Sequence, residues 1–166
     1  MDHHRIYLSG PISGFTFAEA TAWRNEAYDI LSDFAEVLDP MRGKQAPDEQ
    51  EVDAESCDAD DPQLLTDRGI VTRDYFDTRT STILFVNLLG SRKASIGTIA
   101  EIAWAYMLRI PTIIVMENQG NPHEHGFIRE MAGFRVDTVE RGIEIAKSVM
   151  GIPKMDPALD WPSGIY

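Results

Sequence analysis

The sequence contains little cysteine, no long apolar run and little positive charge. Cys57 is the single cysteine among 166 residues, so no disulfide can form within the chain, and we expect a reducing compartment such as the cytoplasm. No stretch of about 18 apolar residues is present, and residues 1–5 carry no apolar signal core. We therefore expect neither a transmembrane segment nor a membrane partner.

Acidic residues outnumber basic ones, 27 Asp and Glu against 15 Lys and Arg, which gives a formal net charge of -12. A protein that binds nucleic-acid polymers would need a basic face to neutralise phosphates, so that class is excluded as a partner. A small anionic ligand remains compatible with this charge, because a helix N-terminus and a few local donors can hold one phosphate.

Much of the acid lies between Lys44 and Pro62, and this stretch predicts a solvated acidic loop over residues 44–62 in which Cys57 has no special role. The stretch lacks the glycine and the terminal glutamate spacing of a calcium loop. We expect no metal site there and no cofactor in the protein.

Along the chain, segments with the apolar pattern of a strand alternate with segments in which apolar residues recur at helical spacing. They predict five strands, at residues 5–9, 36–39, 83–88, 112–116 and 134–136. Helices are predicted between and after the strands: one with its buried face on Trp23, Ala27, Ile30, Leu31 and Phe34, and others at 64–80, 97–108, 125–131 and 138–150.

Strands separated by helices predict an α/β fold, here a flavodoxin-like three-layer sandwich with a five-stranded parallel sheet. Residues 1–150 are expected to form one domain, and residues 151–166 a tail wrapped on its surface. Ligands of such sheets bind at the carboxyl ends of the strands, beside the switch point. The turn after Ser9, the segment after Leu88 and the start of the helix that carries Glu101 should meet there.

Glu101 stands out because the helix around it is otherwise apolar, and a buried ionised group is costly unless it is paired, neutralised or used. One interpretation is a capping box, in which Thr98 caps the helix and Glu101 bonds back to the cap amide. The other is a catalytic carboxylate at the mouth of the sheet.

Three motifs bear on this choice: Ile6-Tyr7-Leu8-Ser9-Gly10-Pro11-Ile12-Ser13-Gly14, Asp74 ahead of the third strand, and Ser95-x-Gly97-x-x-x-Glu101. Together they resemble the nucleoside 2-deoxyribosyltransferase superfamily, which includes nucleoside 5'-monophosphate N-hydrolases and phage-type proteins of nucleotide metabolism and salvage. The likeness spans residues 5 to 150 without the acidic loop. It implies cleavage of the N-glycosidic bond of 2'-deoxynucleosides or their 5'-monophosphates, with transfer of the sugar to another base or to water.

The resemblance also implies three catalytic roles. Glu101 would be the nucleophile that forms a glycosyl ester, Tyr7 would orient it, and Asp74 would supply or relay a proton to the departing base. From the residues alone, Tyr7 is equally a buried core aromatic and Asp74 a solvated helix residue.

Ser95 bears on the substrate. By the resemblance, an aspartate at this position is typical of enzymes acting on free nucleosides, and a serine is typical of the monophosphate hydrolases. Pro11 and Ser13 stand where those hydrolases have a serine and an arginine, and Thr82 replaces a family aspartate. The substrate-binding residues implied within the chain are Ser9, Gly10, Pro11, Ser13, Asn87, Ser95, Gly97 and Thr98.

His125 matches a position from which the family sends a polar side chain into the neighbouring subunit's pocket, which implies a homodimer or a higher even oligomer. A surface loop histidine is the alternative, and His123 with His125 alone would make a poor zinc site. A non-catalytic nucleotide-binding or sensing protein remains the alternative function. A flavin or dinucleotide protein is disfavoured because no G-x-G-x-x-G follows the first strand.

Overall fold

The computed structural model describes residues 4–52 and 57–153. Five strands form one sheet in which every pairing is parallel, in the order β2-β1-β5-β6-β7. Their bounds are β1 (Arg5–Ser9), β2 (Glu36–Leu38), β5 (Ile83–Asn87), β6 (Thr112–Val115) and β7 (Phe134–Val136). The predicted α/β flavodoxin-like arrangement is confirmed, whereas most of the predicted tail, 154–166, lies outside the described residues.

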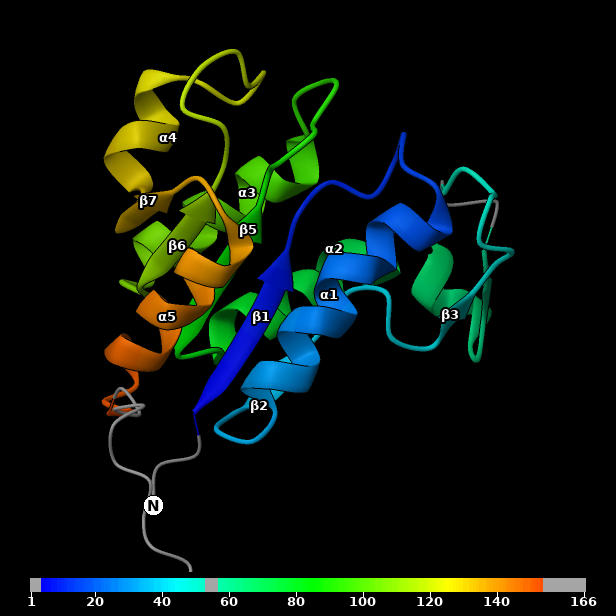
Figure 1. Ribbon diagram of the computed structural model, residues 1–166. Coiled ribbons are helices and arrows are strands. Elements are labelled where there is room, and N and C mark those ends of the chain that lie inside the picture. The colour runs from blue at the N-terminus through cyan, green and yellow to red at the C-terminus, as the bar shows by residue number, and fades with distance from the viewer. Residues whose placement is uncertain (1–3, 53–56, 154–166) are drawn as a thin grey trace, which may run out of the picture.

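Helices cover both faces of this sheet (Figure 1). On one face lie α1 (Phe17–Leu31) and α5 (Val139–Val149), and on the other α2 (Asp67–Thr80), α3 (Ile96–Met107) and α4 (Gly126–Met131). A 3-10 turn, η1 (Pro62–Leu65), precedes α2, so the apolar pattern that predicted one helix from residue 64 covers two elements. In the described part of the chain, no helix has both the length and the apolar composition needed to cross a bilayer.

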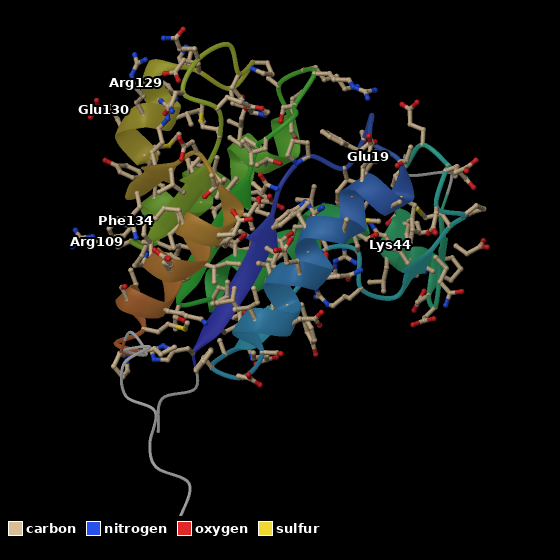
Figure 2. All side chains as sticks on the ribbon, in the orientation of Figure 1. Glu19, Lys44, Arg109, Arg129, Glu130 and Phe134 are labelled. Carbon is tan, nitrogen blue, oxygen red and sulfur yellow. The ribbon has the colours of Figure 1, made fainter. Side chains whose placement is uncertain are left out.

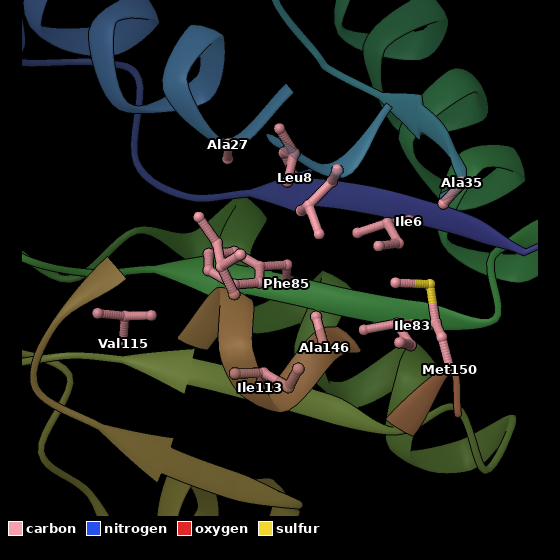
Figure 3. Packing of buried hydrophobic residues seen from close by; sticks show 12 residues of the cluster. Ile6, Leu8, Ala27, Ala35, Ile83, Phe85, Ile113, Val115, Ala146 and Met150 are labelled. Carbon is pink, nitrogen blue, oxygen red and sulfur yellow. The ribbon is translucent and has the colours of Figure 1, made fainter. Parts of the chain in front are cut away.

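Alternation along the strands separates two cores, one on each face of the sheet. Figure 3 shows Leu8, Phe85 and Ile113 from three neighbouring strands packed in the cluster that α1 and α5 cover. The intervening residues of β1 face the other way, and Tyr7 belongs to the core beneath α3. Because Ser9 lies two residues further along β1, its side chain points to the same face as that of Tyr7.

The predicted solvated loop at residues 44–62 is wrong in part, because this segment carries a second sheet. β3 (Lys44–Gln45) pairs antiparallel with β4 (Asp58–Ala59). Val52 and Cys57 are buried with Ala20 and Met41 in a third apolar cluster. Val52 and Cys57 are isolated apolar residues in an acidic segment, and their side chains are buried in this cluster. Cys57 therefore has a packing role that its acidic surroundings did not suggest.

Phe34 is a second departure from the predicted pattern. Helix α1 ends at Leu31, so Phe34 does not continue its buried face, and 40% of its surface is exposed. The ammonium group of Lys147 lies 4.7 Å from the centre of the Phe34 ring, which places this aromatic in a surface cation–π contact.

Candidate active site

A cavity of about 680 Å³ opens at the carboxyl ends of β1 and β5. Its wall includes the turn that follows β1, residues 92–98 at the start of α3, and parts of α2 and of the second sheet. Glu101 lines this cavity although only 6% of its surface is exposed. The turn after Ser9 and the start of the Glu101 helix therefore meet at one crevice, as the strand order predicts.

Two side chains of β1 hold the Glu101 carboxylate. The Tyr7 hydroxyl donates a hydrogen bond to Oε1 at 2.9 Å, and the Ser9 hydroxyl donates one to Oε2. Both donors reach the same carboxyl group because they lie two residues apart on one face of the strand. Both oxygens of Glu101 are thereby oriented by the sheet.

The capping-box interpretation of Glu101 is not what the structure shows. Ser95, not Thr98, is the N-cap of α3, and its hydroxyl oxygen accepts hydrogen bonds from the Thr98 amide at 3.4 Å and the Thr98 hydroxyl at 3.0 Å. The carboxylate of Glu101 bonds to β1 instead of to the cap amide.

Burial is the main influence on the ionisation of Glu101 and of Tyr7. Burial is the largest cause that raises the pKa of Glu101 to about 7, and the negative charge of Asp74 acts in the same direction. The hydrogen bonds from Ser9 and Tyr7, together with the charge of Arg24, act in the opposite direction. Burial and the charge of Glu101 also raise the pKa of Tyr7 well above its usual value, which keeps the phenol protonated as a donor.

Asp74 lies on α2 and lines the same cavity. Its Oδ1 is 3.3 Å from Nε of Arg73, and the Arg73 guanidinium also donates to the carbonyl oxygen of Pro40 at 2.9 Å. Burial raises the pKa of Asp74, while the charge and hydrogen bond of Arg73 lower it. The side chain is 14% exposed, so it is a wall residue of the cavity and not a solvated helix residue.

Arg24 is a buried residue of this region that sequence reasoning missed. Its guanidinium donates to the carbonyl oxygen of Gly10 at 2.9 Å and to that of Ala20, and its Nε lies 3.5 Å from Oδ1 of Asp39. It also stacks on the Trp23 ring at 4.4 Å. The signal was present, because Arg24 falls on the buried face of α1, where a charged side chain needs partners.

Gly10 brings the turn after β1 into close contact with β5. A Cβ at this position would lie 2.5 Å from the carbonyl oxygen of Asn87, closer than real Cβ atoms approach. Only glycine fits this contact without a backbone shift. The Asn87 side chain itself accepts the Leu89 amide at 3.1 Å, and Asn87 is not among the described residues that line the cavity.

The other predicted binding residues fall into three groups. The cavity is lined by Gly10, Pro11, Ser13, Ser95, Gly97 and Thr98. Ser9 is fully buried, bonded to Glu101. His125 is exposed, accepts the Phe127 amide as the N-cap of α4, and is not among the described residues that line this cavity in its own chain. Thr82 lies at the opposite end of the sheet, where its hydroxyl exchanges hydrogen bonds with Arg5.

Among the described residues, three cations line the cavity, and the sequence analysis assigned none of them to it: Lys44 of β3, and Arg92 and Lys93 ahead of α3. Figure 2 shows Lys44 on the side of the molecule opposite α4, which carries Arg129 and Glu130. Within residues 4–52 and 57–153, no group of three or more His, Cys, Asp or Glu side chains could hold a metal ion.

No protein-family model and no curated protein matches the chain. Solved structures do share its fold. A conserved protein from Enterococcus faecalis V583 is 17% identical, with a TM-score of 0.61 over 88% of this chain and 98% of that one. The molybdenum cofactor binding protein from Rippkaea orientalis is 15% identical, with a TM-score of 0.58 over 90% and 99% of the two chains.

A third solved structure with this fold is BcmB, a CMP N-glycosidase from Clostridium botulinum. It is 14% identical, with a TM-score of 0.51 over 87% of this chain and 99% of that one. At these identities the three likenesses establish the fold alone.

Proposed function

We propose that this protein cleaves the N-glycosidic bond of 2'-deoxynucleosides or their 5'-monophosphates, with Glu101 as the nucleophile. The observation that carries the proposal is the buried Glu101 carboxylate at the cavity, held on one oxygen by Tyr7 and on the other by Ser9. The fold shared with a CMP N-glycosidase supports the same class of reaction.

In the first step a carboxylate oxygen of Glu101 forms a bond to C1' of the sugar while the bond from C1' to the base nitrogen breaks. The electron pair of the broken bond goes to the base, which takes a proton from Asp74. In the second step water, or another base, attacks C1', gives its proton to the Asp74 carboxylate, and releases Glu101 as a carboxylate. The raised pKa of Asp74 suits a proton donor.

The start of α3 favours a substrate that carries a 5'-phosphate. The Ser95 hydroxyl and the Gly97 and Thr98 segment line the cavity, and an N-terminal helix turn attracts negative charge. Arg92 and Lys93 add two cations to the same wall, where Pro11 and Ser13 offer none. We therefore propose 5'-monophosphates as the preferred class.

A homodimer, or a higher even oligomer, belongs to the same proposal. The exposed position of His125 on the rim of α4 leaves its imidazole accessible to a second copy of the chain. In that arrangement His125 of one subunit would contact the phosphate or a sugar hydroxyl in the cavity of the other.

The deciding experiment incubates the wild-type protein with a panel of deoxynucleosides and deoxynucleoside 5'-monophosphates, with and without an added acceptor base, and resolves the products by chromatography. Free base without acceptor indicates hydrolysis, and exchanged nucleoside or nucleotide indicates transfer. Glu101→Ala should abolish both while the far-ultraviolet circular dichroism stays unchanged. Tight binding with no turnover by the wild type would replace this proposal with a nucleotide-binding or sensing role.

Ser95→Asp tests the phosphate preference. The added carboxylate should raise KM for 5'-monophosphates by about tenfold or more through charge repulsion, while KM for free nucleosides changes little. Equal effects on the two substrate classes would remove the reason for preferring the monophosphate.

A further inference from the structure

His123 lies between β6 and α4 and is 1% exposed, whereas its neighbour in the motif, His125, is exposed. The Ser95 amide donates a hydrogen bond to Nε2 of His123 at 2.8 Å. Ser95 is the N-cap of α3 and also lines the cavity, so this bond fixes the cavity wall at the point where the helix begins.

The hydrogen bonds of the imidazole fix its tautomer. Nε2 accepts from Ser95 and therefore carries no proton, so the neutral ring bears its proton on Nδ1. Nδ1 lies 3.0 Å from Oδ1 of Asn121 and donates to it. Burial lowers the pKa of His123, which favours the neutral ring that this arrangement requires.

Asn121 connects the His123 imidazole to the start of the loop between β5 and α3, the loop that ends at Ser95. Its Nδ2 donates to the Leu88 carbonyl oxygen at 2.8 Å and to Oε2 of Glu117 at 2.7 Å. Oε1 of Glu117 accepts the Gly90 amide at 2.8 Å. The hydrogen bonds thus reach Leu88 and Gly90, where the β5–α3 loop begins, and Ser95, where it ends.

We propose that Glu117, Asn121 and His123 form a loop clamp that positions the β5–α3 loop, and with it the wall that recognises the substrate. This inference rests on the proposed function for the identity of the ligand. None of the three clamp side chains is among the described residues that line the cavity, so they act through the loop as positioning residues. Glu101 is held separately, by β1.

This separation predicts which kinetic constant changes. Loss of the clamp loosens the wall that carries Arg92, Lys93 and Ser95, but leaves the nucleophile held by Tyr7 and Ser9. His123→Ala should therefore raise KM for the preferred 5'-monophosphate by about tenfold, with kcat within about twofold of the wild type.

His123→Gln provides the matched rescue, because a glutamine side-chain oxygen can accept the Ser95 amide near the position of Nε2. Its KM should stay within about threefold of the wild type. His4→Gln, just before β1 and at the end of that strand away from the cavity, controls for the exchange of residue type. The clamp would be overturned if KM of His123→Gln rose as much as KM of His123→Ala. It would also be overturned if His123→Ala lowered kcat by as large a factor as it raised KM.

Hydrogen exchange of the Ser95 amide in the full chain without ligand gives a readout independent of activity. Exchange should accelerate by at least about tenfold in His123→Ala and stay slow in His123→Gln. Unchanged exchange in His123→Ala overturns the clamp whatever the activity. Full turnover by Glu101→Ala overturns the proposed function instead, and leaves the exchange result standing.

Discussion

The Tyr7 hydroxyl on β1 donates a hydrogen bond of 2.9 Å to Oε1 of Glu101 on α3. The contact joins β1 to the second turn of α3, between two residues that are 94 positions apart in the chain. The hydrogen bond is largely shielded from water, because Tyr7 is fully buried and only 6% of the surface of Glu101 is exposed. A hydrogen bond to an ionised group in such a site is stronger than one in water.

Tyr7→Phe should lower kcat by about 10- to 100-fold, because one charge-assisted hydrogen bond that orients the nucleophile is lost. Steady-state kinetics on the preferred substrate measures the effect. Tyr28→Phe, on the exposed side of α1, is the matched control and should keep the wild-type rate. Unaltered kcat in Tyr7→Phe would show that the phenol does not assist Glu101.

The pH dependence of kcat/KM should show an acidic limb with a midpoint near 7. In the proposed reaction Glu101 attacks only when ionised, and its pKa is raised to about 7, chiefly by burial, so activity should fall as the pH drops through that value. Ser9→Ala should move the midpoint to higher pH, because the lost hydrogen bond favours the ionised form. A flat profile between pH 5 and 8 is incompatible with this role.

Glu101→Gln should stabilise the protein at neutral and alkaline pH. The pKa of Glu101 is about 7 in the folded chain and 4.5 ordinarily, so below the lower value the carboxyl is neutral in both states and the variant gains nothing. Between pH 4.5 and 7 the unfolded wild-type chain releases this proton while the folded chain keeps it, so the wild type loses stability relative to the variant, by on the order of 1–3 kcal/mol once the pH exceeds 7.

Thermal unfolding of Glu101→Gln and of the wild type from pH 4 to 8 tests this expectation. The difference in Tm should appear between the two pKa values and level off above them. Glu130→Gln, on the exposed face of α4, supplies the control. A Tm difference that is constant over the whole range would contradict a raised pKa at Glu101.

Arg24→Met should cost about 3–5 kcal/mol in the free energy of unfolding, because it leaves the Gly10 carbonyl and the Asp39 carboxylate without their buried partner. Arg24→Lys keeps the charge without the planar fork and should cost less. Urea denaturation measures both. A loss below about 1 kcal/mol in Arg24→Met would mean that Asp39 finds a new partner.

Gly10→Ala and Gly97→Ala form a contrasting pair. The methyl group at Gly10 would collide with the Asn87 carbonyl oxygen and should destabilise the protein by about 1–3 kcal/mol. No atom lies within 4 Å of the corresponding Cβ at Gly97, so this helical substitution should stabilise by about 0.5–1 kcal/mol. Calorimetric unfolding compares them, and equal effects would contradict the packing difference.

The fold was predictable because the unbroken apolar runs of the central strands and the helical spacing between them are strong patterns. The meeting of the β1 turn with the start of α3 followed from strand order alone. The second sheet was not predictable, since β3 and β4 have two residues each and lie in an acidic segment.

Parts of the site depend on contacts that local sequence does not encode. Ser95 and Thr98 are both good helix caps by residue type, but α3 begins at Ile96 with Ser95 as its cap, and Glu101 bonds to Tyr7 of β1 instead. His123 and His125 look alike in sequence, yet the tertiary fold buries one and exposes the other. The anchoring of Gly10 by Arg24 likewise needs two segments to meet.

The walls of the cavity come from two sources that differ in how they can change. Glu101 is held by side chains of the central sheet, whereas Lys44, Glu51 and Val52 belong to the segment that carries β3 and β4. Replacing this segment with the corresponding one of another protein of the same fold should re-shape one wall of the cavity. The contacts of Tyr7 and Ser9 with Glu101 would be kept. If Glu101 breaks the bond as proposed, the wall that selects the ligand and the group that performs the chemistry lie on separate parts of the fold and are free to diversify independently.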